Sequence, residues 1–453
     1  MSPGISAIMS SINGFVWGPY MLMFLVGTGL FLSFRLNFIQ IRLLPGAFRL
    51  IFRKTGGGNA AGDITPFQAL TTALSATIGT GNIAGVATAI FLGGPGAVFW
   101  MWVCALFGMA TKYGEAVLAV KFRRMLPDGT MQGGPMMYIA DGLGMKWLGW
   151  LFALMGSFAA FGIGSMVQSN SVALALEKSW NVPPMLTGVV LAVMTAVVII
   201  GGIKRIGRVT EKLVPVMGLF YVAGAMIILV MHWERIPHAL GLILTHAFLP
   251  ASAAGGFAGA AVSAAIRFGV ARGVFSNEAG LGSAPIAHAA AKTDNPARQG
   301  LVAMSGVFFD TIIICTMTAL VILTTDAWTS GATSSAMTHL AFETGLPGIG
   351  GLMVTTGLAV FAYSTMIGWA YYGEECMEYI AGLGARTPYR IVFCLVIAVG
   401  AFQKVDFVWD FSDTMNGAMA IPNLIGLIGL SGTLVRETAK GLEMISFKGD
   451  SRS

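Results

Sequence analysis

The feature that most constrains this chain is a series of apolar runs, each long enough to cross a bilayer, which takes about 20 residues. Only 11% of the residues are charged and the mean hydropathy is +0.76, whereas about a quarter of a soluble domain is charged. We therefore expect an all-α polytopic membrane protein without a soluble catalytic domain. The predicted spans are 14–34, 66–92, 96–120, 148–175, 183–203, 212–233, 254–290, 297–325, 349–372, 388–403 and 414–435.

Composition excludes several other classes of protein. The net charge of +6 does not indicate a nucleic-acid partner, because the cations lie between apolar runs rather than on one folded surface. Cys104, Cys315, Cys376 and Cys394 fall inside or at the edge of apolar segments without metal-ligand spacing, so neither disulfides nor zinc are expected. No Lys or Arg precedes Arg35, so the first span lacks the basic region of a cleaved signal peptide and should remain as a helix.

Basic residues set the orientation, since Lys and Arg in short loops stay on the cytoplasmic side. They cluster after the first, third, fifth, seventh, ninth and eleventh spans, while the opposite loops hold only Lys178, Arg235 and Lys404. This asymmetry fits eleven spans in a bacterial or archaeal inner membrane, with the N-terminus outside and the C-terminus cytoplasmic. The stretch from Pro237 to Pro250 is too short to span, and we expect a loop or interfacial helix there.

Two mid-span glycine motifs suggest an internal repeat. Residues 79–85 of the second span read GTGNIAG, and residues 275–285 of the seventh read FSNEAGLGSAP. Glycine costs a helix about 1 kcal/mol and proline about 3, so both helices should be broken there. Paired broken helices in inverted halves mark the binding site of a secondary transporter of small solutes. Glycines can also serve close helix packing alone, although that would leave polar residues at these depths unexplained.

Each broken span is followed by four further spans, which makes two blocks of five. Because five is odd, the second block starts from the opposite side of the membrane and the repeats are inverted. The predicted segments are an extra helix and linker (1–63), a first repeat (64–235), an extracellular connection (236–253), a second repeat (254–435) and a cytoplasmic tail (436–453).

Three strings, at 79–85, 272–285 (RGVFSNEAGLGSAP) and 416–423 (NGAMAIPN), resemble the alanine or glycine:cation symporter family, also called sodium:alanine symporters. The resemblance runs from about Trp17 to the end of the last span. It implies a LeuT-type fold of the amino acid-polyamine-cation superfamily, with a five-plus-five inverted repeat and one extra N-terminal helix. It also implies coupling to Na⁺ or H⁺, a small neutral amino acid such as alanine or glycine as substrate, no organic cofactor and no obligate protein partner.

The first break is a candidate carboxylate site. A helix that restarts in mid-membrane presents unpaired amides and the positive end of its dipole. We expect the amides near Thr80, Gly81 and Asn82 to hold the substrate carboxylate, with Gly79 and Gly81 allowing close approach.

The second break is expected to expose carbonyl groups around Phe275, Ser276 and Glu278, near Gly280, that accept hydrogen bonds from the substrate ammonium. Gln168 in the fourth span either hydrogen-bonds the substrate or bonds a neighbouring helix. Trp369 and Phe275 could close over a small side chain, although such aromatics are often packing residues or interface anchors.

Adjacent hydroxyls at Ser364 and Thr365 are candidate cation ligands, because hard cations prefer oxygen. In the LeuT-type fold such a pair binds sodium with carbonyls just before the first break, which here are those of Ser75 and Ile78. The alternative is that both hydroxyls bond back to carbonyls of their own helix.

Asp310, in the middle of span eight, is an isolated carboxylate that costs about 2.5 to 3.5 kcal/mol at that depth. It could hold a second cation with Asn82 and Ser276, exchange a proton, or pair with Arg267 or Arg272.

Arg272 and Glu278 are expected either to pair as a gate or to brace the unwound segment. Lys112 and Glu115 should snorkel to the end of span three. The loop from Asp326 to Gly348, without Lys or Arg, could form a lid.

Rival classes lack their motifs. Gly79-x-Gly81-x-x-Ala84 matches a dinucleotide fingerprint only formally, because it lies within a membrane span. No catalytic motif of a membrane enzyme is present, so the chain is not expected to be an enzyme. A channel, an amino-acid exchanger and the permease subunit of a multi-component transporter remain alternatives to a symporter.

Overall fold

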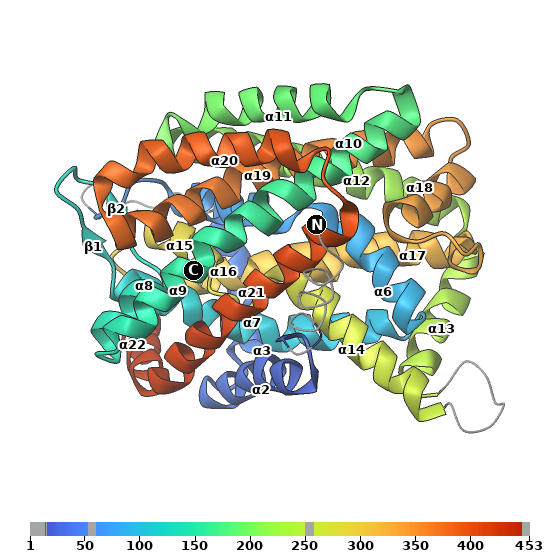
Figure 1. Cartoon of the computed structure of the whole chain (residues 1–453). Coiled ribbons are helices and arrows are strands. Elements are labelled where there is room, and N and C mark those ends of the chain that lie inside the picture. Colours follow the sequence, from blue (N-terminus) through green and yellow to red (C-terminus); the bar gives the residue numbers. More distant parts are fainter. Residues whose placement is uncertain (1–13, 15, 53–59, 250–257, 446–453) are drawn as a thin grey trace, which may run out of the picture.

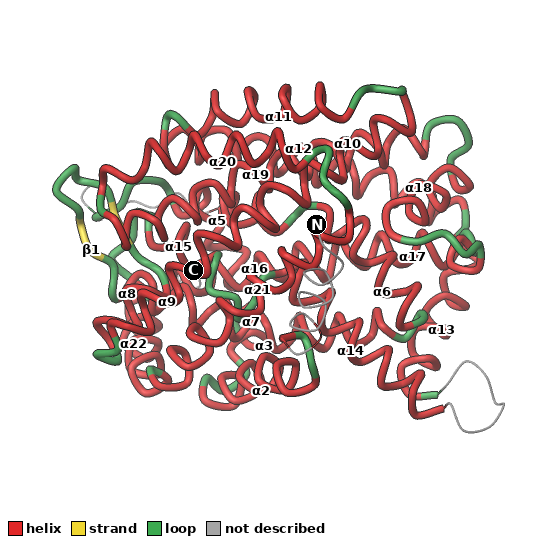
Figure 2. Tube along the Cα trace, in the orientation of Figure 1, coloured by secondary structure: helices red, strands yellow, loops and turns green. Residues whose placement is uncertain are grey.

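A computed structural model describes residues 14, 16–52, 60–249 and 258–445, and these are almost entirely helical (Figures 1 and 2). A two-stranded hairpin, β1 (Arg124–Met125) with β2 (Met131–Gln132), is the sheet within these residues. The α-helices are α2 (Pro19–Arg35), α3 (Ile39–Arg42), α4 (Leu44–Phe52), α5 (Pro66–Thr77), α6 (Val86–Gly93), α7 (Ala97–Lys121), α8 (Pro135–Met137), α9 (Lys146–Phe161), α10 (Val167–Trp180), α11 (Pro184–Ile199), α12 (Gly202–Met231), α13 (Ile236–Phe248), α14 (Ala258–Asn277), α15 (Ala284–Ala289), α16 (Pro296–Val307), α17 (Thr316–Thr324), α18 (Ser334–Gly345), α19 (Gly350–Ala381), α20 (Arg386–Gly400), α21 (Val405–Gly429) and α22 (Ser431–Met444).

Short segments of other helix types interrupt or join these α-helices. The π-helical segments are η1 (Gly81–Gly85), η2 (Tyr138–Gly142), η3 (Gly162–Met166) and η5 (Phe308–Cys315), and the 3-10 segments are η4 (Trp233–Arg235), η6 (Ala327–Thr329) and η7 (Leu383–Ala385). Three of the π-helical segments, η1, η3 and η5, lie inside predicted spans and change the direction in which the following side chains point. Such π-helical turns often occur at functional sites.

Every predicted span overlaps a helix or a broken helix. Among the described residues, six helices are long and apolar enough to cross a membrane, or eight if each of two bent pairs is one span. The count of eleven spans therefore stays a prediction. Two starts were predicted too late, because α12 begins at Gly202 and α21 at Val405; charged residues in their first turns masked the helices. The predicted boundary at 253/254 and the end of the tail lie outside the described residues.

Large apolar side chains are exposed on the outer surface, and polar side chains are buried within the mainly apolar core, as expected for a protein in lipid. Val193 of α11, Leu219 of α12 and Leu395 of α20 are 59%, 70% and 61% exposed. In contrast, Asn82 and Asp310 are fully buried. Polar groups in hydrocarbon are expensive unless they face a partner or a cavity, so these buried polar side chains point to a functional interior.

The first predicted break is confirmed between α5 and α6. Helix α5 begins with a capping box, in which Thr65 and Gln68 satisfy each other's amides, and ends at Thr77. Ile78 is then extended, with ψ 94°, and the chain restarts through η1 at an angle of 52° to α5.

The second predicted break is confirmed between α14 and α15. Glu278 has φ 55°, and Gly280 and Gly282 have φ 91° and 84°. A left-handed conformation is uncommon for a residue with a side chain, so Glu278 must be held in place by its surroundings.

The two breaks lie against each other inside the bundle. A methyl group on Gly81 would lie 3.2 Å from Cδ1 of Phe275 and 3.4 Å from Cα of Ser276. Helices α7, α9 and α19 pack around this centre, and α11 and α20 pack together at its periphery (Figure 1). The β1–β2 hairpin marks one end of the bundle, the hairpin end, and α13 and α18 mark the other, the α18 end (Figure 1).

Candidate transport site

The restart after Ile78 brings polar groups to the centre of the bundle. Asn82 turns its side chain back along the chain, so that Oδ1 accepts a hydrogen bond from the amide of Gly79 at 2.9 Å. The hydroxyl of Thr80 is buried and has no hydrogen-bond partner among the described residues. The first amides of a helix generally have no acceptor within that helix, although here the amide of Asn82 donates to the carbonyl of Gly79 at 3.3 Å. The restart can therefore donate to an anionic group.

Gln168 presents its carbonyl oxygen to this first break. Its Nε2 donates to the carbonyl of Ile163 at 2.9 Å, within its own broken helix, and its Oε1 is buried without a partner among the described residues. A methyl group on Gly79 would lie 3.5 Å from that Oε1. Gln168 therefore does not make the bond to a neighbouring helix that was the expected alternative. Its buried Oε1 could accept a hydrogen bond from a donor on a ligand.

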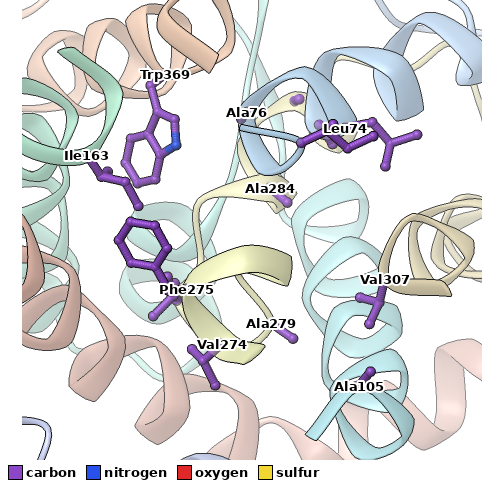
Figure 3. Packing of buried hydrophobic residues seen from close by; sticks show 14 of the residues in the cluster. Leu74, Ala76, Ala105, Ile163, Val274, Phe275, Ala279, Ala284, Val307 and Trp369 are labelled. Carbon is purple, nitrogen blue, oxygen red and sulfur yellow. The ribbon is translucent and has the colours of Figure 1, made fainter. Parts of the chain in front are cut away.

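Glu278 and Trp369 join the second break to α19. Nε1 of Trp369 donates to Oε1 of Glu278 at 2.8 Å, and the hydroxyl of Ser283 donates to Oε2. In Figure 3 the rings of Trp369 and Phe275 point toward one another, with Ile163 beside them. Trp369, Phe275 and Ile163 belong to one buried cluster and form an apolar wall next to the broken helices.

Arg272 and Glu278 do not form the expected pair. Nη2 of Arg272 instead lies 3.4 Å from Oδ2 of Asp413 on α21, and its guanidinium lies 5.5 Å from the rings of Phe275 and Trp409. Glu278 lies just past the end of α14 in a left-handed conformation, and its carboxylate is bonded to Trp369 and Ser283 instead. Glu278 braces the unwound segment, which was the other expectation.

The oxygens around Ser364 and Thr365 converge as the family resemblance implied. The hydroxyl of Ser364 lies 3.3 Å from the carbonyl oxygen of Ser75 and 3.4 Å from that of Ile78, and the Thr365 hydroxyl lies 3.3 Å from Ile78. Both hydroxyls also reach the carbonyl of Phe361 on their own helix, at 2.8 and 3.1 Å. The back-bonding alternative therefore coexists with the convergence, which forms a set of buried hard oxygens.

Asp310 forms the centre of a second polar cluster. Its Oδ1 accepts a hydrogen bond from Nδ2 of Asn82 at 2.7 Å, and its Oδ2 accepts from the hydroxyls of Ser276 and Thr311, each at 2.8 Å. The π-helical segment η5 carries Asp310 and directs it inward. The pairing with Arg267 or Arg272 is wrong, because neutral donors from both broken helices satisfy the carboxylate.

Gly280 has its peptide groups occupied by the protein. Its amide donates to Oε1 of Glu115 at 3.1 Å, and its carbonyl accepts from Nδ2 of Asn423 at 2.8 Å. Gly280 was expected among the substrate contacts; in this structure its role is conformational, through its φ of 91°.

Lys112 and Glu115 are the site residues that sequence reasoning missed. Snorkelling was expected for both, but Lys112 is 3% exposed and Glu115 fully buried. Helix α7 packs lengthwise against α14, α15 and α16, so this part of it faces protein rather than the membrane boundary. The sequence signal that could have indicated their burial is the presence of two opposite charges one turn apart in an apolar helix.

The predicted lid region contains a helix that covers the first break. Helix α18 packs on η1, and the hydroxyl of Thr338 donates to the carbonyl of Ile83 at 2.9 Å. Hydrogen bonds from the amides of Gly348 and Gly351 hold the pKa of Glu343 below its ordinary value and tie α18 to the start of α19.

Known proteins resemble this chain over almost its whole length. A model of the sodium:alanine symporter family matches residues 3–445. The sodium/alanine symporter AgcS of Methanococcus maripaludis is 55% identical over 95% of this chain and 96% of its own length, and the probable sodium/glutamine symporter GlnT of Bacillus subtilis is 37% identical over 94% and 88%. The crystal structure of MhsT in complex with L-phenylalanine has a TM-score of 0.57 at 13% identity, covering 84% of this chain and all of MhsT, and shows the shared LeuT-type fold.

Proposed function

This chain belongs to the sodium:alanine symporter family, and from that premise we propose that it couples Na⁺ entry to uptake of a small neutral amino acid, alanine or glycine, by alternating access. Family membership identifies it as a membrane transporter and not as an enzyme. The observation that carries the proposal is the contact between two broken helices around Gly81, Phe275 and Ser276 in mid-bundle.

The substrate carboxylate is assigned to the amides of Thr80, Gly81 and Asn82, at the positive end of the restarted helix. Its ammonium is assigned to the carbonyls of Phe275 and Ser276 and to Oε1 of Gln168. Gln168 supports this assignment because a buried amide oxygen without a partner gains a donor when substrate binds. No basic side chain is needed for a zwitterion held in this way.

Substrate size is assigned to the wall formed by Trp369 and Phe275. Trp369 cannot move away toward η3, because a methyl group on Gly164 would already lie 2.2 Å from its Cβ. The bond to Glu278 fixes its indole from the other side. A fixed wall favours a methyl or hydrogen side chain. GlnT is named as a probable sodium/glutamine symporter, so size selection can differ between relatives.

The coupling Na⁺ is assigned to the hydroxyls of Ser364 and Thr365 with the carbonyls of Ser75 and Ile78. Hard cations hold oxygens at roughly 2.4 Å, so ligands at right angles around the ion are about 3.4 Å apart. The spacings of 3.3 to 3.4 Å agree with that geometry. Because Ile78 directly precedes Gly79, an ion here would order the backbone that binds the substrate.

A second cation is assigned to Asp310 with Asn82 and Ser276. This cluster joins both broken helices, so its occupancy would report on the arrangement of the two repeats. One charge moving inward through a potential of about 100 mV contributes about 2.3 kcal/mol. That supports about fifty-fold accumulation of substrate.

The hairpin end is assigned to the cytoplasm of an inner-membrane protein, and the α18 end to the outside. Arg123, Arg386 and Arg390 are bonded at the hairpin end, and basic loops are retained inside. The repeats at 64–235 and 254–435 would then rock about the central site. The Arg272–Asp413 pair, with Phe275 and Trp409, is assigned as the outer gate.

The test is uptake of labelled alanine by purified protein in proteoliposomes under an imposed Na⁺ gradient, an H⁺ gradient or no gradient. Uptake above the external concentration only with Na⁺ supports the symporter. Accumulation driven by an H⁺ gradient alone would show that H⁺, and not Na⁺, is the coupling ion. Uptake that requires amino acid inside the liposomes would identify an exchanger. Equilibration without accumulation, with single-channel currents, identifies a channel, and a requirement for ATP identifies a multi-component permease. Competition by glycine, serine and glutamine then sets the size limit.

A further inference from the structure

Glu115 of α7 holds the unwound segment of the second repeat from outside the substrate site. Its Oε1 accepts hydrogen bonds from the amides of Gly280 and Gly282, each at 3.1 Å, and from Nδ2 of Asn423 at 2.7 Å. The side chain is fully buried. One buried carboxylate oxygen thus collects three donors from two different elements and ties those elements together.

The segment that Glu115 holds cannot keep its shape by itself. Glu278, Gly280 and Gly282 all have positive φ, so two of the three positions are glycines without conformational preference. Glu115 and Asn423 fasten one side of the segment, and the bond from Trp369 to Glu278 fastens the other. Without Glu115, the amides of Gly280 and Gly282 lose their acceptor in a site without exposed surface.

Lys112 supplies the countercharge. It lies one helical turn before Glu115 and is 3% exposed, and its ammonium has no hydrogen-bond partner among the described residues. Its charge interacts with those of Glu115, Glu278 and Asp310. Oε2 of Glu115 is also without a hydrogen-bond partner in the described chain. A buried charge is tolerated better where an opposite charge lies near it, so Lys112 offsets part of the cost of burying the Glu115 carboxylate.

The contact also reaches the hairpin end. Asn423 donates to both Glu115 and the carbonyl of Gly280, and its Oδ1 accepts from the hydroxyl of Tyr138 in η2. The segment 278–282 is therefore joined to α7, to α21 and to the short helix η2 beside the hairpin.

We infer that Glu115 is a positioning residue for transport: it shapes segment 278–282 so that Glu278 meets Trp369 and the preceding carbonyls face the substrate, while Lys112 balances its charge. This rests on the proposed function. It assigns a role to two side chains that the carboxylate, ammonium and sodium positions do not use.

The experiment compares Glu115→Gln, Glu115→Leu, Lys112→Met and Lys112→Met/Glu115→Gln in proteoliposomes at equal amounts of folded protein. Glutamine keeps an acceptor oxygen at the same reach, whereas leucine keeps only the volume. Half-saturating alanine should rise about tenfold for Glu115→Leu and stay within about threefold for Glu115→Gln. Lys112→Met should be impaired because it removes the positive charge that faces Glu115, whereas in Glu115→Gln the lysine still faces Glu278 and Asp310. The neutral double variant should return to the level of Glu115→Gln.

Lys121→Met is the matched control, since it removes a lysine from the same helix at a side chain that is 41% exposed. Folded Glu115→Leu with unchanged half-saturation would overturn the inference, as would Glu115→Gln as impaired as Glu115→Leu. A merely structural role would lower the yield of folded protein and leave half-saturation unchanged in what remains.

Hydrogen exchange separates this inference from the proposed function. The amides of Gly280 and Gly282 should exchange faster in Glu115→Leu than in the native chain and the Lys121→Met control. Exchange can be measured even if the native protein does not take up alanine. In that case the proposed function fails, and the exchange rates of these two amides still test whether Glu115 holds the segment. If Glu115→Leu does not fold, Glu115→Asp, whose carboxylate is one methylene shorter, replaces it, with the same expected direction in both measurements.

Discussion

The hydroxyl of Thr365 on α19 lies 3.3 Å from the carbonyl oxygen of Ile78, the residue at which the first broken helix ends, although 287 positions separate them in the chain. The pair joins the second repeat to the break in the first. It also places the proposed ion ligands next to Gly79, where the substrate backbone site begins.

Replacing both hydroxyls, Ser364→Ala/Thr365→Ala, should raise the Na⁺ concentration for half-maximal uptake by about tenfold or more, because two hard-oxygen ligands are lost at about 1 kcal/mol each. Alanine uptake at different Na⁺ concentrations measures it. Thr356→Ala, on the exposed face of the same helix, should leave the Na⁺ dependence unchanged. Unchanged dependence in the double variant would remove this site from the mechanism.

Gly79→Ala should lower the apparent affinities for Na⁺ and for alanine together. The added methyl would lie 2.5 Å from Oγ1 of Thr365, which must rotate away from the carbonyl of Ile78. We expect about tenfold weaker apparent affinity for Na⁺, corresponding to about 1.4 kcal/mol. Gly85→Ala is the control, since a methyl there meets nothing within 4 Å. Equal behaviour of the two variants would contradict the close approach at Gly79.

Asp310→Asn should make the Na⁺ dependence of uptake less steep. Asparagine keeps the shape but removes the charge that would attract a second cation, so the Hill coefficient should fall toward one. Uptake across Na⁺ concentrations, with charge movement measured in parallel, decides this. Asp326→Asn removes a carboxylate that is 59% exposed and should have no effect. A native Hill coefficient already near one would argue for a structural or proton-carrying Asp310.

Arg123→Ala should loosen the hairpin end. The guanidinium donates four hydrogen bonds of 2.6 to 2.9 Å, two from each terminal nitrogen. The accepting carbonyls belong to Ala61, Ala289, Ala291 and Thr293. They lie just before the first broken helix and at the end of the second, so Arg123 ties the two together. Hydrogen bonds to charged groups contribute about 1.5 to 3 kcal/mol each, so their loss should favour opening toward the cytoplasm.

Hydrogen exchange measures that opening. The amide of Asp63 bonds the carbonyl of Ala290 at 2.8 Å and that of Lys292 bonds Ile64 at 2.7 Å, so both should exchange faster in Arg123→Ala. Arg124→Ala is the neighbouring control, because its side chain is 62% exposed and pairs only with Asp141 among the described residues. Equal protection in both variants would show that Arg123 does not hold this end closed.

The fold was predictable because its signals are local. Hydropathy predicted most of the helices. The glycines at 79, 81, 280 and 282 predicted the two breaks, since glycine weakens a helix wherever it lies. The oxygens of Ser364 and Thr365 were located through resemblance to a known family, and their convergence on Ser75 and Ile78 agrees with it.

Contacts set by the direction of a side chain were not predictable from the sequence. Arg272 meets Asp413 instead of Glu278, because α14 ends at Asn277 and the left-handed turn at Glu278 redirects its side chain. The depth of Lys112 and Glu115 depends on which neighbours α7 has, and the π-helical turns of η3 and η5 add a residue to the local period without a composition that announces it. These errors concern tertiary packing and not helix identity.

The bare backbone of Gly79 lies between the two proposed binding sites: Oγ1 of Thr365 approaches it from α19 and the unsatisfied Oε1 of Gln168 from α10. Under the proposed assignment, coupling between ion and substrate needs no relay through the protein, since either one would change the peptide planes that the other contacts. A carrier whose two binding sites share one backbone surface resists uncoupled transport, because neither site is complete while the other is empty.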